Sequence, residues 1–254
     1  MRAFFIGLQF LTRLCIVKQD NWTEQDFGES VKYFPLIGAV LGAIYAGAAY
    51  LMTVFLPSFG VMLPPHLVTV VLLVLPILMS GGIFCDGFMD TMDGVFSGRS
   101  RERMLEIMKD SCVGSNAVFC FVALMLLEWG TLLDMEPSVL VPALFIMPII
   151  ARLMVVIEIR RFPLARPDGL GRMFSDYSTA NTLIIALIST LILLVPCGIL
   201  AYICLAVGTA FSYFFAGYVT KRIGGMTGDV YGATATLTEA LVLLTYLIAG
   251  RFIQ

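Results

Sequence analysis

The chain is organised around residues 80–116, which read SGGIFCDGFMDTMDGVFSGRSRERMLEIMKDSCVGSN, where an apolar run ends and carboxylates begin. Asp86, Asp90 and Asp93 are spaced i, i+4 and i+7, so at about 100° per residue they share one helix face. Like charges on one face repel one another, unless a cation holds them together. Mg²⁺ takes carboxylate oxygens together with substrate phosphates. The stretch therefore predicts a divalent-metal site for a phosphorylated substrate.

A second acidic pair follows in the same stretch. We expect a second helix there, with Glu106 and Asp110 one turn apart. This pair has an alternative explanation, because Arg103 and Lys109 are near enough for ordinary ion pairs. For the first three aspartates the alternative is a solvated helix end, which is less favoured because no lysine is interleaved among them.

The composition predicts a membrane protein. Of the 254 residues, 59% are hydrophobic and only 13% are charged, whereas a soluble domain is nearer half apolar and a quarter charged. We expect an all-α, polytopic helical bundle that forms a single membrane-embedded domain over residues 1–254, with lipid as its surroundings. The net charge of -2 says nothing about nucleic acid, but the chain has no basic arm or tail, so we expect no nucleic-acid partner. The six cysteines include no CxxC pair and are expected to be buried hydrophobes.

About seven apolar stretches approach the roughly 20 residues that cross a bilayer core. In the first of them, Gly38 and Gly42 indicate close packing between helices. Before it, segment 1–34 is expected to carry an amphipathic helix on the membrane interface instead of a cleaved signal peptide. The predicted spans are 35–56, 66–86, 112–133, 137–158, 179–195, 198–219 and 233–250.

Lysine and arginine predict the orientation of the chain. Fifteen of the 16 basic residues fall in the N-terminal segment, in 87–111, 159–178 and 220–232, or at the adjacent span ends; only Arg251 does not. Basic residues favour cytoplasmic connections. We therefore expect a multi-pass protein with a cytoplasmic N-terminus and with the acidic segment 87–111 facing the cytoplasm.

Two further polar loops are expected on that side. Residues 160–176 combine arginines with glycines, and residues 221–232 read KRIGGMTGDVYG. Arginine binds phosphate in a forked geometry, and glycine-rich backbone at a helix start can cradle it. The alternatives are orienting charge alone for the first loop and a tight turn for the second. The candidate substrate-binding residues in these loops are Arg166, Lys221, Gly225 and Thr227.

Two ionisable residues fall inside predicted spans. Arg152 and Glu239 lie one to two turns from the ends of their helices. Charged groups at such depth are costly and usually face a polar cavity. We therefore include both among the candidate substrate-binding residues, with Arg152 as a candidate for phosphate.

These motifs together resemble a known family. Asp90-x-x-Asp93-Gly94 is similar to the acidic signature of membrane CDP-alcohol phosphotransferases, but the residues after it depart from that pattern. Residues 81–114 more closely resemble the hallmark GGxxxDGxxDTxDGxFSGRxRxRMLEIMKDSxxG of the cobalamin synthase, or adenosylcobinamide-GDP ribazoletransferase, family. Further matching motifs are FLTR at 10–13, FPLIG at 34–38, Ala165-Arg166, GLG at 169–171 and GGMTGD at 224–229.

The resemblance implies a Mg²⁺-dependent enzyme of the inner membrane. It would join adenosylcobinamide-GDP to α-ribazole or its 5′-phosphate, with release of GMP. The resemblance leaves open a homo-oligomer or a complex with other cobalamin-assembly enzymes. Two alternatives remain, namely a CDP-alcohol phosphotransferase of phospholipid synthesis and an ion-coupled transporter. The implied metal ligands are Asp86, Asp90, Asp93 and Asp110, and the implied catalytic residues are Asp86, Asp90, Asp110 and Asp229, with the base left open between Asp110 and Asp229.

Overall fold

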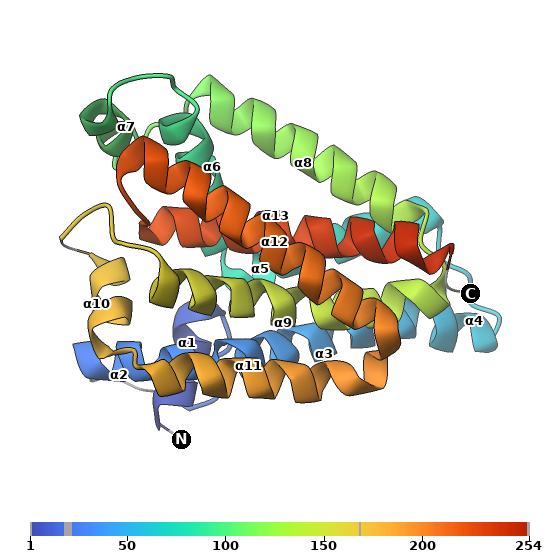
Figure 1. Cartoon of the computed structure of the whole chain (residues 1–254). Coiled ribbons are helices and arrows are strands. Elements are labelled where there is room, and N and C mark those ends of the chain that lie inside the picture. The colour runs from blue at the N-terminus through green and yellow to red at the C-terminus, as the bar shows by residue number, and fades with distance from the viewer. Residues whose placement is uncertain (1, 18–21, 168, 253–254) are drawn as a thin grey trace.

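The computed structural model describes residues 2–17, 22–167 and 169–252 as a bundle of α-helices (Figure 1). Lys18, which contributes to the charge pattern, lies outside the described residues. No β-strand occurs in the described part of the chain, so the all-α prediction is confirmed. The helices are α1 (Arg2–Leu11), α2 (Glu24–Ser30), α3 (Phe34–Tyr50), α4 (Leu56–Ser58), α5 (Pro65–Ser80), α6 (Ile83–Val95), α7 (Arg101–Ile107), α8 (Ser115–Leu133), α9 (Pro137–Arg161), α10 (Leu170–Tyr177), α11 (Ala180–Leu194), α12 (Gly198–Ile223) and α13 (Gly228–Gly250).

Five helical stretches are long and apolar enough to cross a membrane, or six if the bent pair of α5 and α6 is one span. The sequence predicts about seven because it divides 180–223 into two spans. This stretch contains α11 and α12, which meet at a turn near residue 198 and then diverge (Figure 1). The polytopic architecture is confirmed. The five stretches are Glu24–Ser58, Ser115–Leu133, Pro137–Arg161, Ala180–Ile223 and Gly228–Gly250.

Helix α9 forms the centre of the bundle. It is buried along most of its length, with α3 and α13 packed against it. A Cβ atom on Gly38 or Gly42 would overlap the carbonyl oxygens of Pro148 and Phe145 on α9. These glycines therefore let α3 approach the backbone of α9, which confirms the packing role predicted from their spacing.

A sharp bend separates α5 from α6. Gly81 and Gly82 have φ angles of +66° and +82°, which glycine adopts without strain but which end a helix. The two helices meet at 91°. The predicted span 66–86 is therefore wrong at its end, because its helix stops at Ser80. The bend directs α6 towards the end of the bundle where α7 lies (Figure 1).

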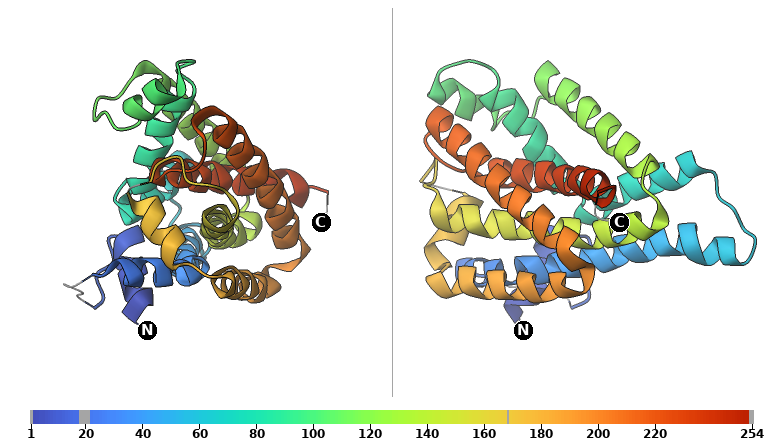
Figure 2. Two further views of the ribbon diagram at one scale, coloured as in Figure 1. Left: turned by 60° about the vertical axis from the view of Figure 1, so that its left-hand side comes forward. Right: turned by 45° about the vertical axis from the view of Figure 1, so that its right-hand side comes forward.

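The two ends of the bundle carry different loops. Helices α7 and α10 lie at one end, whereas α4 and the C-terminus lie at the other (Figures 1 and 2). The loops at the first end include Arg99, Arg101 and Arg166, as the alternation of basic residues predicts. Helix α7 ends at Ile107, so the prediction that Glu106 and Asp110 share a helix is wrong.

Candidate active site

Helix α6 presents its acidic face where it crosses α13. A Cβ atom on Gly87 would lie 2.7 Å from the carbonyl oxygen of Asp229, and one on Gly232 would lie 3.2 Å from the Cα of Gly87. The missing side chains allow the two backbones to touch. This contact brings Asp229 beside the carboxylates of α6, although 143 positions separate it from Asp86 in the sequence.

Four carboxylates share this region. Asp90 is close enough to Asp86, Asp93 and Asp229 for each of them to repel its negative charge. The three aspartates of α6 lie on one helix, as predicted. They also line a cavity of about 230 Å³ together with Asp110, which enters from the loop after α7. The sequence prediction that these residues belong together is therefore consistent with the geometry.

Asp93 differs from its neighbours because it holds the start of α8. Its carboxylate accepts hydrogen bonds from the backbone N–H groups of Gly114 and Ala117, the latter at 2.9 Å. The first N–H groups of a helix have no partner within that helix, and a carboxylate stabilises them. Asp93 thus joins α6 to α8 at the rim of the cavity.

Asp110 is exposed at the other side of the same cavity. Its carboxylate accepts a hydrogen bond from the backbone N–H of Cys112 at 3.0 Å, and this bond lowers the pKa of Asp110 below its usual value. Asp110 therefore stays ionised at neutral pH. Glu106, by contrast, forms a 2.8 Å ion pair with Arg103, which is the alternative that the sequence left open for it.

The carboxylates do not form a closed cage. Over residues 2–17, 22–167 and 169–252, no three acidic, histidine or cysteine side chains converge closely enough to hold one metal ion by themselves. Mg²⁺ sites in phosphoryl-transfer enzymes commonly use one or two carboxylates, with substrate phosphates as further ligands. The donor set around the 230 Å³ cavity fits that kind of site.

The two loops predicted to bind phosphate cross one another beside α13. The backbone N–H of Met226 donates to Pro163 at 2.8 Å, and that of Ala165 donates to Met226 at 2.9 Å. Gly225 lies at the crossing, where any Cβ atom would overlap the backbone of the other loop. Its role is therefore to let the loops meet, because only glycine leaves room for this contact.

Thr227 begins α13 and orients Asp229. Its hydroxyl accepts from the N–H of Val230 at 3.3 Å and donates to the Asp229 carboxylate at 3.2 Å. Next to them lies a cavity of about 150 Å³, with Arg166 and Arg172 on its wall. Asp229 lines this cavity too, so the basic and acidic regions of the site adjoin at one residue.

The remaining basic candidates are placed differently. The guanidinium of Arg166 donates to the carbonyl of Leu105 at 2.8 Å, which fixes it against helix α7. Lys221 is exposed in the last turn of α12 and does not line the Arg166 cavity. Arg101, which the sequence analysis did not single out, donates to the carbonyls of Ile223 at 2.8 Å and Ala165 at 3.3 Å. Its position as the first residue of α7 carries no sequence signal for this bridging role.

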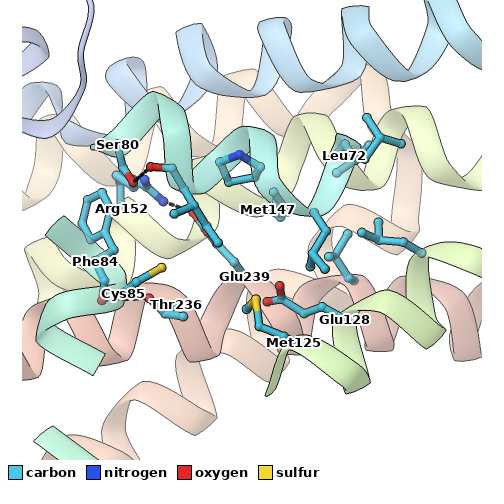
Figure 3. A pocket seen from close by; sticks show the side chains of 16 residues that line it. Leu72, Ser80, Phe84, Cys85, Met125, Glu128, Met147, Arg152, Thr236 and Glu239 are labelled. Carbon is cyan, nitrogen blue, oxygen red and sulfur yellow. Dashed lines mark hydrogen bonds and ion pairs between the residues drawn. The ribbon is translucent and has the colours of Figure 1, made fainter. Parts of the chain in front are cut away.

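Arg152 and Glu239 lie away from the acidic face, in a cavity within the bundle (Figure 3). They form an ion pair with each other, and Arg152 is only 2% exposed. Its guanidinium also stacks over the ring of Phe84 at 4.1 Å. Both residues line a cavity, as predicted, but its wall is mostly apolar and not polar. The structure also does not bring them to the loops that carry Arg166.

Glu158 is a second buried acid that sequence reasoning missed. It is fully buried on α9, where one carboxylate oxygen accepts hydrogen bonds from Ser212 at 2.9 Å and Thr234 at 3.0 Å. Glu158 was missed because it is the last residue of the predicted span 137–158 and is followed by a basic loop, a position at which an acidic residue is usually exposed. Only the packing of α12 and α13 shows that it is enclosed.

The fold and the site together define a polytopic helical membrane protein with an acidic cavity and an arginine-lined cavity at one end of its bundle. A family model described as cobalamin-5-phosphate synthase matches residues 3–247. The chain belongs to this family. The family resemblance read from the motifs is thus confirmed over nearly the whole chain.

Individual relatives agree with the family match. An adenosylcobinamide-GDP ribazoletransferase of Desulfitobacterium hafniense (strain Y51) is 38% identical over 251 residues, which cover 96% of both chains. Proteins of the same name are 33% identical in Clostridium acetobutylicum, over 96% of this chain and 95% of the relative, and 32% identical in Clostridioides difficile (strain 630), over 99% and 100%. No solved structure matches this chain.

Proposed function

We propose that this chain is an adenosylcobinamide-GDP ribazoletransferase that acts in the last steps of cobalamin biosynthesis. It joins adenosylcobinamide-GDP to α-ribazole or its 5′-phosphate, and the products are GMP and adenosylcobalamin or its 5′-phosphate. The relatives that match end to end carry this name. The observation that carries the proposal is the meeting of Asp86, Asp90 and Asp229 between an acidic cavity and an arginine-lined one.

The reaction is a phosphoryl transfer. A hydroxyl oxygen of the ribazole forms a bond to the phosphorus that carries the cobinamide, and the bond from that phosphorus to the bridging oxygen breaks. The bond electrons leave with GMP. The hydroxyl proton passes to a carboxylate, for which Asp229 and Asp110 are the two candidates, because Asp229 lines the arginine-lined cavity and Asp110 lines the acidic one. Such chemistry depends mainly on positioning and charge stabilisation.

Asp86, Asp90 and Asp110 are proposed to hold Mg²⁺, with Asp93 completing the rim. When bound, Mg²⁺ would neutralise the diphosphate and stabilise the leaving phosphate. The repulsion around Asp90 supports this assignment, since several carboxylates are kept near one another without an ion-paired lysine or arginine among the described contacts. Because no cage is preformed, the substrate phosphates are expected to complete the ligand set.

The diphosphate and GMP portion is proposed to occupy the arginine-lined cavity. Arg166 and Arg172 supply positive charge there, and the N-terminus of α13 at Gly228 supplies backbone N–H groups. Asp229 would then lie next to the reacting phosphorus. The Arg152–Glu239 pair is proposed to have a structural role instead of binding phosphate, because Arg152 and Glu239 already pair with each other inside the bundle.

The active site is proposed to face the cytoplasm from the inner membrane. The basic loops gather at the end of the bundle that carries the acidic face (Figure 1), and basic loops favour the cytoplasmic side. Reporter fusions at positions 100 and 226 should report the cytoplasm, and fusions at 60 and 135 the outside. An outside signal at 100 or 226 would contradict this orientation.

The activity has a direct test. Purified protein in lipid nanodiscs receives α-ribazole and adenosylcobinamide-GDP, and GMP release is measured with Mg²⁺ and with EDTA. In a parallel reaction, CDP-diacylglycerol and an alcohol acceptor such as glycerol 3-phosphate or inositol replace both substrates, and CMP release is measured. We expect Mg²⁺-dependent GMP release and no CMP. Release of CMP alone would establish the phospholipid alternative.

A further inference from the structure

A fourth cavity, of about 220 Å³, borders the acidic face at Asp86. It is formed where α1, α3 and α10 pack against α6, α9 and α13. Its wall is mainly aromatic and apolar, and its two acidic lining residues are Asp86 on α6 and Asp229 on α13. The aromatic and aliphatic side chains of this wall include those of Phe10, Phe34, Phe84, Val155, Phe174 and Tyr231.

The rings of this wall support one another. Phe174 meets Phe10 edge-on at 5.7 Å and Phe34 at 5.6 Å, measured between ring centroids. Phe10 meets Phe27 in the same way at 5.4 Å. Edge-to-face contacts hold rings in defined orientations. The N-terminal helix and α10 are therefore built into a rigid aromatic surface directly behind the acidic face.

The cavity connects to both halves of the proposed transfer site. Asp86 lines it and also lines the acidic cavity, while Asp229 lines it and also lines the arginine-lined cavity. A ligand that fills the aromatic cavity therefore presents its open end to both carboxylates. That is where the attacking hydroxyl has to lie if the proposed reaction takes place.

We propose that this aromatic cavity binds the heteroaromatic base of the acceptor nucleoside and selects which base the enzyme accepts. The proposal rests on the function proposed above. That reaction involves three aromatic bases, namely guanine, the adenine of the adenosyl group and the base of α-ribazole. Guanine and adenine carry several hydrogen-bond donors and acceptors along their edges. They would lose their partners against a wall of phenylalanine, and unpaired polar groups are costly to bury.

The base of α-ribazole suits the wall better. A benzimidazole attached through one ring nitrogen keeps a single acceptor and is otherwise apolar, so it buries its flat surface against aromatic rings at little cost. Its ribose then lies at the mouth, with hydroxyls next to Asp86 and Asp229. The arginine-lined cavity remains free for the diphosphate and guanosine.

The test fills the cavity without touching the acidic residues. Val155 lies on its wall in α9, and Val155→Phe adds a ring to the space that the base would occupy. Val141→Phe is the matched control, because Val141 is on the same helix but outside this cavity. For the full chain in nanodiscs, we would measure thermal melting, calorimetric binding of α-ribazole alone, and KM for each substrate.

We expect Val155→Phe to raise the KM and the Kd for α-ribazole by about tenfold or more, as steric mismatch in an apolar pocket does. The KM for adenosylcobinamide-GDP should stay within twofold, and Val141→Phe should resemble wild type. In Val155→Phe, a nucleoside with unsubstituted benzimidazole should lose less binding affinity than a nucleoside with the bulkier 5,6-dimethylbenzimidazole. This dependence on base size distinguishes a base pocket from a general loss of structure.

Three results would overturn the proposal. One is a folded Val155→Phe protein with unchanged α-ribazole binding, and another is a rise only in the KM for adenosylcobinamide-GDP. The third is binding that weakens equally in the Val141→Phe control. If wild type releases no GMP, the proposed function fails, and the calorimetric arm decides the cavity separately: saturable α-ribazole binding lost in Val155→Phe supports the pocket, and no binding overturns it.

Discussion

The acidic face of α6 and the Arg152–Glu239 pair both place charge in an apolar protein, but they compensate it differently. Arg152 and Glu239 are each other's opposite charge, and Phe84 covers the guanidinium. At the end of the bundle Asp86, Asp90 and Asp229 repel one another. A buried ion pair is costly to break because the remaining charge loses its partner, whereas a cluster of like charges costs stability until a ligand relieves it. The comparison therefore suggests a structural role for the Arg152–Glu239 pair and a ligand-binding role for the α6 carboxylates.

The largest expected effect concerns the unpaired carboxylates. Asp86→Asn or Asp90→Asn should lower kcat/KM by about a thousandfold or more, because charge stabilisation is the main catalytic contribution once the substrates are positioned. Without metal the variants should be as stable as wild type or slightly more stable, since repulsion is removed. GMP release measures the activity, and thermal melting with and without Mg²⁺ measures the stability. Glu106→Gln is the control, because Glu106 is exposed and paired with Arg103.

Substitutions in the Arg152–Glu239 pair should lower stability, whereas substitutions of the α6 carboxylates should lower activity. Arg152→Met or Glu239→Gln leaves one buried charge without its partner, which costs about 3–5 kcal/mol of unfolding free energy. The double variant Arg152→Met/Glu239→Leu should recover most of that loss. Thermal melting in nanodiscs follows the change. If Arg152→Met instead raises KM for adenosylcobinamide-GDP while melting at the wild-type temperature, Arg152 binds phosphate and the comparison fails.

A smaller effect is expected at the basic edge of the site. Arg166→Ala should lower kcat/KM for adenosylcobinamide-GDP by roughly ten- to a hundredfold, as expected for one charge-assisted hydrogen bond of about 1.5–3 kcal/mol. Lys221→Ala is the matched control and should change little, because Lys221 does not line the arginine-lined cavity. Equal losses in both variants would mean that general positive charge, not a fixed contact, attracts the substrate.

The smallest effect distinguishes Asp93 from its neighbours. Asp93→Ala removes the acceptor for two N–H groups at the start of α8 and should cost about 1 kcal/mol of stability, as other helix caps do. Asp90→Ala, which removes no such bond, should cost less. Thermal melting without Mg²⁺ compares them. A larger loss for Asp90→Ala would show that the acidic face contributes to folding as well as to chemistry.

Much of this molecule could be predicted from local patterns. Runs of apolar residues predicted the spans, because a bilayer core demands about 20 of them. The spacing of Asp86, Asp90 and Asp93 predicted a shared helix face, since an α-helix repeats every 3.6 residues. The prediction was wrong where it depended on exact helix ends, at Ser80 and at Ile107. Those ends depend on a glycine bend and on a short helix, for which periodicity is a weak guide.

The sequence by itself determined the helical membrane architecture, the family and the acidic face of α6, because composition, motifs and residue spacing can each be read without knowing which helices touch. Tertiary structure alone decided which distant residues share a site. Asp229 reaches α6 only because Gly87 and Gly232 let two backbones touch. Arg152 and Lys221, which looked equivalent to Arg166 as charged candidates, lie elsewhere. The physical reason is that the charge of a side chain is set by its residue type, whereas the groups it contacts depend on how the helices pack against one another.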